Sequence, residues 1–210
     1  QFNVTGGGAF CEGESGVSVG LDGSEIGINY ELFRNGNSVL TQAGTGNSLD
    51  FGLQTQAGMY TVAAENTTTL CTSNMLGNAV ITISPLPTQF NVTGGGAFCE
   101  GESGVSIGLD GSELGINYEL FRDGNSVLTQ AGTGNALDFG LQTQAGTYTV
   151  TAENLTTLCT SNMLGSAVIT IEPLPTQFNV TGGGAFCEGE SGVSVGLDGS
   201  EIGVDYELFR

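Results

Sequence analysis

The chain has 210 residues and a formal net charge of -19, because 22 acidic residues stand against only three basic ones. Nucleic acid is excluded as a partner, since phosphate binding requires clusters of Lys and Arg. An anionic membrane surface is disfavoured for the same reason, and no stretch approaches the roughly 20 apolar residues of a membrane span. The chain has no His, Lys or Trp, which removes the usual general base and the Schiff-base amine. We therefore expect no catalytic residues and no cofactor.

The sequence repeats every 88 residues. The segment that begins at Gln1 recurs from Gln89 and again from Gln177, where it stops in mid-pattern at Arg210. We expect one domain over residues 1–88, a second over 89–176 and a truncated third over 177–210. This arrangement favours the interpretation that the chain is a segment of a longer array of repeats.

Within one copy, apolar residues alternate with polar or small ones, which is typical of strands with one buried face. In chain order the alternating runs cover 2–4, 17–21, 28–32, 49–53, 60–64 and 79–83. Turn signals such as Asp22-Gly23 and Asn35-Gly36 separate them. Six or seven short strands per copy predict an all-β fold, with one antiparallel β-sandwich in each repeat. The expected core residues are Val19, Tyr30, Leu32, Phe51, Tyr60, Val62 and Ile81.

Three local signals indicate how each sandwich is closed and joined. The Gly run 6–8 is expected to let the first strand bend or approach its neighbour closely. Tyr60 and Tyr148 each follow a Gly at the start of a strand, which predicts a tyrosine corner. Pro85 and Pro87 predict an extended, semi-rigid connection between copies. Domains placed end to end in this way would form a rod.

The run from Gly146 to Asn154, followed by Cys159, resembles the penultimate strand of tandem immunoglobulin-like repeats in giant Bacteroidota cell-surface adhesins, of which the gliding-motility adhesins are the best-known group. The corner at 11–13 and the strands at 16–19 and 30–32 are similar to the same family. The resemblance implies immunoglobulin-like sandwiches in a long filament that is secreted to the bacterial cell surface.

Two functions fit these patterns. One is a structural stalk or spacer of an extracellular filament or adhesin, whose partners are the neighbouring repeats of the same chain, with lateral self-association as a further option. The other is a repeated binding module that recognises glycan, calcium or a protein partner through sandwich loops. Exposed aromatic side chains would favour the binding module, and Phe10 and Phe33 are the candidates.

Four carboxylates near turns are weak candidates for calcium ligands, because Ca²⁺ prefers hard oxygen ligands. These are Glu12, Glu14, Asp22 and Glu25. Their spacing matches neither an EF-hand nor the repeat of calcium-binding solenoids. Solvated loop carboxylates are the favoured interpretation.

The five cysteines, Cys11, Cys71, Cys99, Cys159 and Cys187, are separated alternately by 60 and 28 residues. In an extracellular repeat protein this pattern predicts disulfides. Pairing within a copy would join Cys11 to Cys71 and Cys99 to Cys159. However, the first and second cysteine of a copy are expected at opposite ends of the sandwich, and a disulfide requires Cα atoms within ~7 Å. Pairing between copies, Cys11 with Cys159, therefore competes with it, unless the connection before the last strand folds back along the sandwich.

Overall fold

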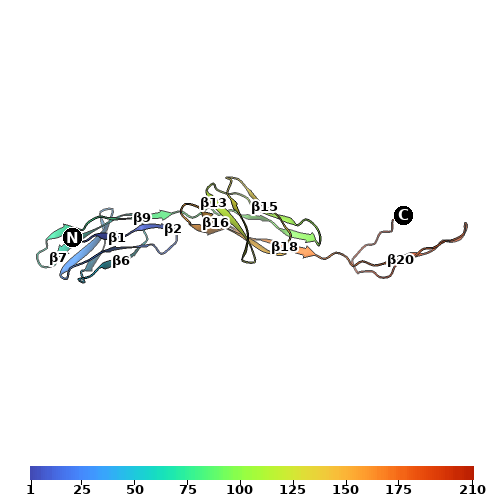
Figure 1. The fold of residues 1–210 in the computed structure, drawn as a ribbon, viewed down its shortest axis with the longest axis horizontal. Coiled ribbons are helices and arrows are strands. Elements are labelled where there is room, and N and C mark those ends of the chain that lie inside the picture. The colour runs from blue at the N-terminus through green and yellow to red at the C-terminus, as the bar shows by residue number, and fades with distance from the viewer.

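The computed structural model describes residues 1–210 as an all-β chain. Two β-sandwiches follow one another, and a shorter segment extends beyond them (Figure 1). We call residues 1–88 the first sandwich, 89–176 the second sandwich and 177–210 the third segment. No helix is present that is long and apolar enough to cross a membrane.

Each sandwich has two sheets, and the first shows the pattern. Its smaller sheet has the order β1-β3-β6 and its larger sheet the order β2-β9-β7-β4-β5, with β8 paired to β7. All pairings are antiparallel except that of β2 with β9. An initial strand divided between two sheets, with this order, is an immunoglobulin-like arrangement. The bounds are β1 (Val4–Gly6), β2 (Gly8–Cys11), β3 (Val17–Leu21), β4 (Ile28–Arg34), β5 (Asn37–Ala43), β6 (Leu49–Gln54), β7 (Gly58–Asn66), β8 (Thr72–Asn74) and β9 (Ala79–Ser84).

The second sandwich has the same topology, in the orders β10-β12-β15 and β11-β18-β16-β13-β14, with β17 paired to β16. In the third segment, β19 pairs with β20. The bounds are β10 (Val92–Gly94), β11 (Gly96–Cys99), β12 (Val105–Leu109), β13 (Ile116–Arg122), β14 (Asn125–Ala131), β15 (Leu137–Gln142), β16 (Gly146–Asn154), β17 (Thr160–Asn162), β18 (Ala167–Glu172), β19 (Val180–Gly182) and β20 (Val195–Leu197).

Each sandwich has its own apolar core between the two sheets. The tyrosine corner is confirmed, because the hydroxyl of Tyr60 donates to the carbonyl oxygen of Gln56 at 2.8 Å, and Tyr148 repeats this bond to Gln144 at 2.8 Å. The predicted inward positions of the first copy are all buried: Val19, Tyr30, Leu32, Phe51, Tyr60, Val62 and Ile81. The period-2 pattern therefore predicted the buried face correctly.

The glycine run marks the point where the first strand changes sheets, because β1 pairs with β3 and β2 pairs with β9. Gly6 and Gly7 have φ angles of 88° and 80°. A Cβ on Gly6 would lie 2.1 Å from the backbone oxygen of Ser18, and one on Gly7 would lie 2.8 Å from that of Val80. The crossing thus requires both the backbone freedom and the small size of glycine.

Several positions differ from the sequence-based expectation, among them Ile83, the last apolar residue of the 79–83 run, which is 39% exposed. Leu53 is 58% exposed and Gln54 is buried, because the β3–β6 pairing shifts register and Gly52 has a φ of 79°, which interrupts the alternation. Phe10 was a candidate for an exposed aromatic, but only 8% of its surface is exposed and it belongs to the core. Phe33, the other candidate, is half-buried.

Candidate functional site

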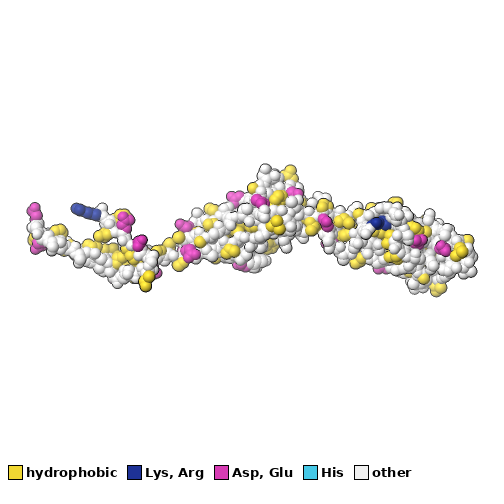
Figure 2. All heavy atoms as spheres, turned by 180° about the vertical axis from the view of Figure 1, so that it is seen from behind, with side chains coloured by type: hydrophobic (Ala, Val, Ile, Leu, Met, Phe, Trp, Pro, Cys, Tyr) yellow, Lys and Arg dark blue, Asp and Glu magenta, His cyan; other side chains and the backbone are white.

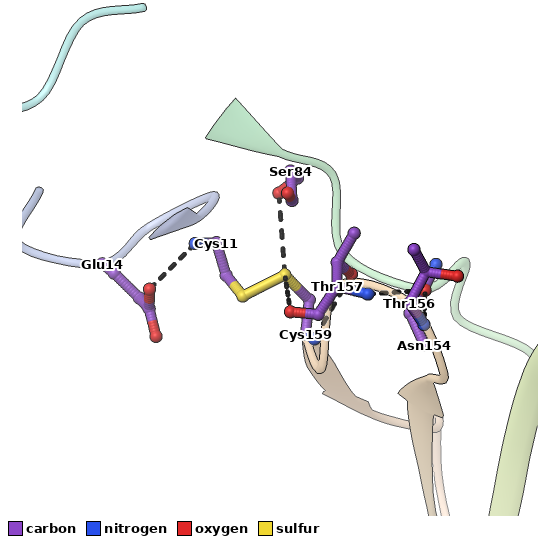
Figure 3. Close-up of a disulfide and its surroundings, with 7 residues drawn as sticks. All are labelled: Cys11, Glu14, Ser84, Asn154, Thr156, Thr157 and Cys159. Atoms are coloured by element: carbon purple, nitrogen blue, oxygen red, sulfur yellow. Dashed lines mark hydrogen bonds between the residues drawn. A yellow bond between two sulfur atoms is a disulfide. The ribbon is translucent and has the colours of Figure 1, made fainter. Parts of the chain in front are cut away.

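The most distinctive chemical feature of the structure is a disulfide between the two sandwiches. Cys11 is bonded to Cys159, with Cα atoms 5.6 Å apart and a sequence separation of 148 residues (Figure 3). The pairing within a copy is not formed, since Cys71 and Cys99 are free and exposed, as is Cys187. Of the two pairings that the sequence left open, the structure contains the one between copies. We call the contact region, residues 11–14, 84–88, 113 and 154–159, the joint.

Cys11 lies at the joint because of the parallel pairing of β2 with β9. In this register Cys11 is opposite Ser84, the last residue of β9, so it lies where the chain leaves the first sandwich. The backbone N–H of Glu12 donates to the carbonyl oxygen of Ser84 at 2.9 Å. The Glu14 carboxylate accepts the backbone N–H of Cys11 at 2.8 Å (Figure 3). These bonds hold the cysteine at the end of the sheet.

Cys159 lies at the near end of the second sandwich because it closes the β16–β17 hairpin. The register pairs Glu153 with Thr160, which leaves residues 154–159 as the hairpin loop. The Asn154 side-chain oxygen accepts the backbone N–H groups of Thr156 and Thr157 at 2.9 and 3.1 Å. The backbone of Asn154 also accepts the N–H of Leu158 at 2.8 Å. The loop therefore stays at the end of the sandwich and does not fold back along its side.

A second contact at the joint fixes the linker, and no sequence pattern predicted it. The Thr88 backbone N–H donates to the Glu113 carboxylate at 3.1 Å, and the Thr88 hydroxyl donates to it at 2.7 Å. The next linker repeats the backbone bond, from Thr176 to Glu201 at 2.6 Å. Pro87 is buried as well. The extended linker is thus attached to the second sandwich over its last residues.

Equivalent residues in the two copies show which surface the joint covers. Cys159 and Met163 are 1% and 6% exposed, whereas Cys71 is exposed and Met75 is half-buried. Because the local sequences are nearly the same, the difference comes from the first sandwich packing on the end of the second. At the uncovered end of the first sandwich, a cavity of about 220 Å³ opens between residues that include Ile28, Cys71 and Met75.

The four calcium candidates are not brought together. No group of three or more acidic or Cys side chains in the structure has the geometry to hold a metal ion. Glu14 bonds to the backbone beside it, and Asp22 accepts the backbone and side-chain N–H groups of Asn3 at 2.8 and 2.6 Å. Acidic side chains are scattered over the visible face (Figure 2). Glu12 and Glu25 are therefore not part of a group of side chains that could hold a metal ion.

The Asn–Asp contact changes the acidity of one carboxyl in each copy. Hydrogen bonds from the side chain and backbone of Asn3 hold the pKa of Asp22 below its ordinary value. Equivalent bonds from Asn91 and Asn179 lower the pKa of Asp110 and of Asp198, respectively. Hydrogen bonding to the charged form is the cause in each case, and these surface carboxylates serve the fold by connecting β-strand ends.

No protein-family model matches the chain, and no curated protein is significantly similar to it in sequence. Similar solved structures exist. One is a chain of the mouse coronavirus receptor-binding domain complexed with its murine receptor, with 13% identity, a TM-score of 0.45, and coverage of 82% of this chain and 100% of that chain. Murine CEACAM1b follows with 13% identity, a TM-score of 0.42 and the same coverage. The fibronectin(III)-like modules of Clostridium thermocellum CbhA have 10% identity, a TM-score of 0.40, and coverage of 82% and 95%. Similarity at this level assigns neither family nor function.

Proposed function

We propose that this chain is a structural stalk, a spacer segment of a long extracellular filament or adhesin. The observation that carries the proposal is the Cys11–Cys159 bond, because it joins two sandwiches, whereas no disulfide is formed within either one. A module that acted alone would gain nothing from such a bond. A rod that must keep its domains in line would gain a fixed joint.

The repeat extends this joint to neighbouring copies. Cys71 occupies in the first sandwich the position that Cys159 has in the second, and Cys99 corresponds to Cys11. Both are free and exposed. We propose that the copies 1–88, 89–176 and 177–210 belong to an array in which Cys71 bonds to a preceding copy and Cys99 to a following one. Every joint of the filament would then carry one disulfide.

The disulfide also supports a location outside the cell. Structural disulfides persist in oxidising compartments and are rare in the cytosol. Together with the resemblance to Bacteroidota adhesin repeats, this favours a secreted filament at a bacterial cell surface. The binding-module alternative has less support, since Phe10 is buried and Phe33 is half-buried.

Electron microscopy of the native material tests the stalk. We expect a thin fibre with one bead per copy, at a spacing of roughly 35–45 Å from the lengths of strands of this kind. Compact particles, or globules linked by flexible tethers, would contradict the proposal. Side-by-side fibres would show lateral self-association, which the net charge of -19 opposes at low salt.

A further inference from the structure

We infer that the Cys11–Cys159 bridge has a mechanical function: it provides a short covalent path that carries tension past both sandwiches, so that the rod keeps its length even when a sandwich unfolds. The biological use of this property rests on the proposed stalk function. The path itself follows from the connectivity of the disulfide.

The bridge divides the chain into a loaded part and a shielded part. Tension applied at Gln1 reaches Cys11, crosses the disulfide to Cys159 and continues toward Arg210. The residues between the two cysteines form a closed loop that includes β3 to β16. Because the bridge is the shorter covalent route, this loop carries no tension once the path is taut. Most of both cores, which lie within the loop, is therefore shielded.

The loaded path is already nearly extended in the folded protein. Residues 1–11 contain β1 and β2, and 159–176 contain β17 and β18. Because β2 ends at the joint and β17 begins there, the first run crosses the first sandwich lengthwise and the second run crosses the second (Figure 1). A strand rises about 3.3 Å per residue, against at most about 3.6 Å for a fully extended chain. Straightening the path can therefore add little length.

The lengths can be compared with and without the bridge. The two runs and the bridge reach about 100 Å when fully extended, whereas two folded sandwiches span about 80 Å, so unfolding releases about 20 Å. Without the bridge, residues 1–176 would extend to about 630 Å and release about 550 Å. The bridge therefore reduces the extension more than twenty-fold. A Cys11–Cys71 bond would not do so, because the second sandwich would remain free to extend.

Single-molecule pulling on the full chain, held by handles at both ends, tests the inference. We expect the oxidised protein to lengthen by no more than about 20 Å from the two sandwiches at forces that unfold immunoglobulin-like domains. Adding a reductant should release about 550 Å, in two steps, from the same preparation. Because the comparison with and without reductant uses the wild-type protein, it does not depend on a variant that might fail to fold.

Two serine variants complete the test. Cys11→Ser removes the bridge and should release the full length without reductant. Cys99→Ser makes the same change at the equivalent position of the second copy and should behave as the wild type. Oxidised wild type whose two sandwiches release clearly more than about 20 Å, the limit set by the path, would overturn the inference. Fibre images are independent of this result, so failure of the stalk proposal and failure of the mechanical inference can be told apart.

Discussion

The bridge should also stabilise the second sandwich at equilibrium, and Cys159→Ser measures by how much. When this sandwich unfolds while the first stays folded, the bridge keeps residues 89–159 in a closed loop. A loop of about 70 residues loses chain entropy worth about 4 kcal/mol at 25 °C. We expect Cys159→Ser to lower the free energy of unfolding by this amount, or the melting temperature by roughly 15–30 °C for a domain of this size.

The assay is scanning calorimetry of the oxidised proteins without reductant. Cys71→Ser is the matched control, because it makes the same change in the same loop of the first copy, where the thiol is free. We expect the control to melt as the wild type does. A difference below about 1 kcal/mol between Cys159→Ser and the wild type would refute the entropic argument. Equal loss in both variants would indicate that the serine itself disturbs the loop.

Three further predictions concern the second sandwich. Tyr148→Phe removes one buried hydrogen bond and should cost about 1 kcal/mol of unfolding free energy, measured by urea denaturation; no change would mean that the corner bond contributes nothing. Gly94→Ala should cost at least about 2 kcal/mol, because its Cβ would lie 2.1 Å from a backbone oxygen, whereas Gly101→Ala, whose Cβ meets open space at a similar φ, should cost about 1 kcal/mol. The lowered pKa of Asp110 means that the folded state binds fewer protons, so its contribution is complete above the ordinary carboxyl pKa and is lost as the pH falls through the lowered value. The melting temperature of Asp110→Asn should therefore fall less than that of the wild type between about pH 5 and 2, and parallel curves would contradict this.

The strand pattern was predictable where burial alone decides the side-chain direction. Tyr30 and Leu32 alternate with polar residues and are buried as expected. The pattern failed at Leu53, because a glycine with positive φ interrupts the alternation, and period-2 counting cannot detect that irregularity. It also missed β8 and β17, since strands of three residues are too short to show a period. The seven-residue strands β5 and β14 were missed because neither has a fully buried residue to mark an inward face.

The joint was predictable only in part. Topology placed Cys11 and Cys71 at opposite ends of one sandwich, which raised the bond between copies as an alternative. The choice depended on whether the hairpin loop folds back. This is decided by bonds from the backbone N–H groups of Thr156 and Thr157 to the side-chain oxygen of Asn154, and an Asn in a loop indicates a turn but not where the loop lies. The Thr88–Glu113 contact joins residues from two copies and became visible only with their placement.

The joint exists only if Cys11 is bonded to Cys159 and not to Cys71. Proteolysis of the oxidised full chain under non-reducing conditions, followed by mass spectrometry of the linked peptides, identifies the partner. Trypsin cleaves after Arg34 and Arg122, which places Cys11, Cys71 and Cys159 in three different peptides. A second protease that cleaves after aromatic residues separates Cys71 from Cys99 and Cys159 from Cys187. We predict a linked pair containing Cys11 and Cys159, with Cys71 recovered as a free thiol. A linked pair containing Cys11 and Cys71 would contradict the joint, the stalk proposal that depends on it and the mechanical inference.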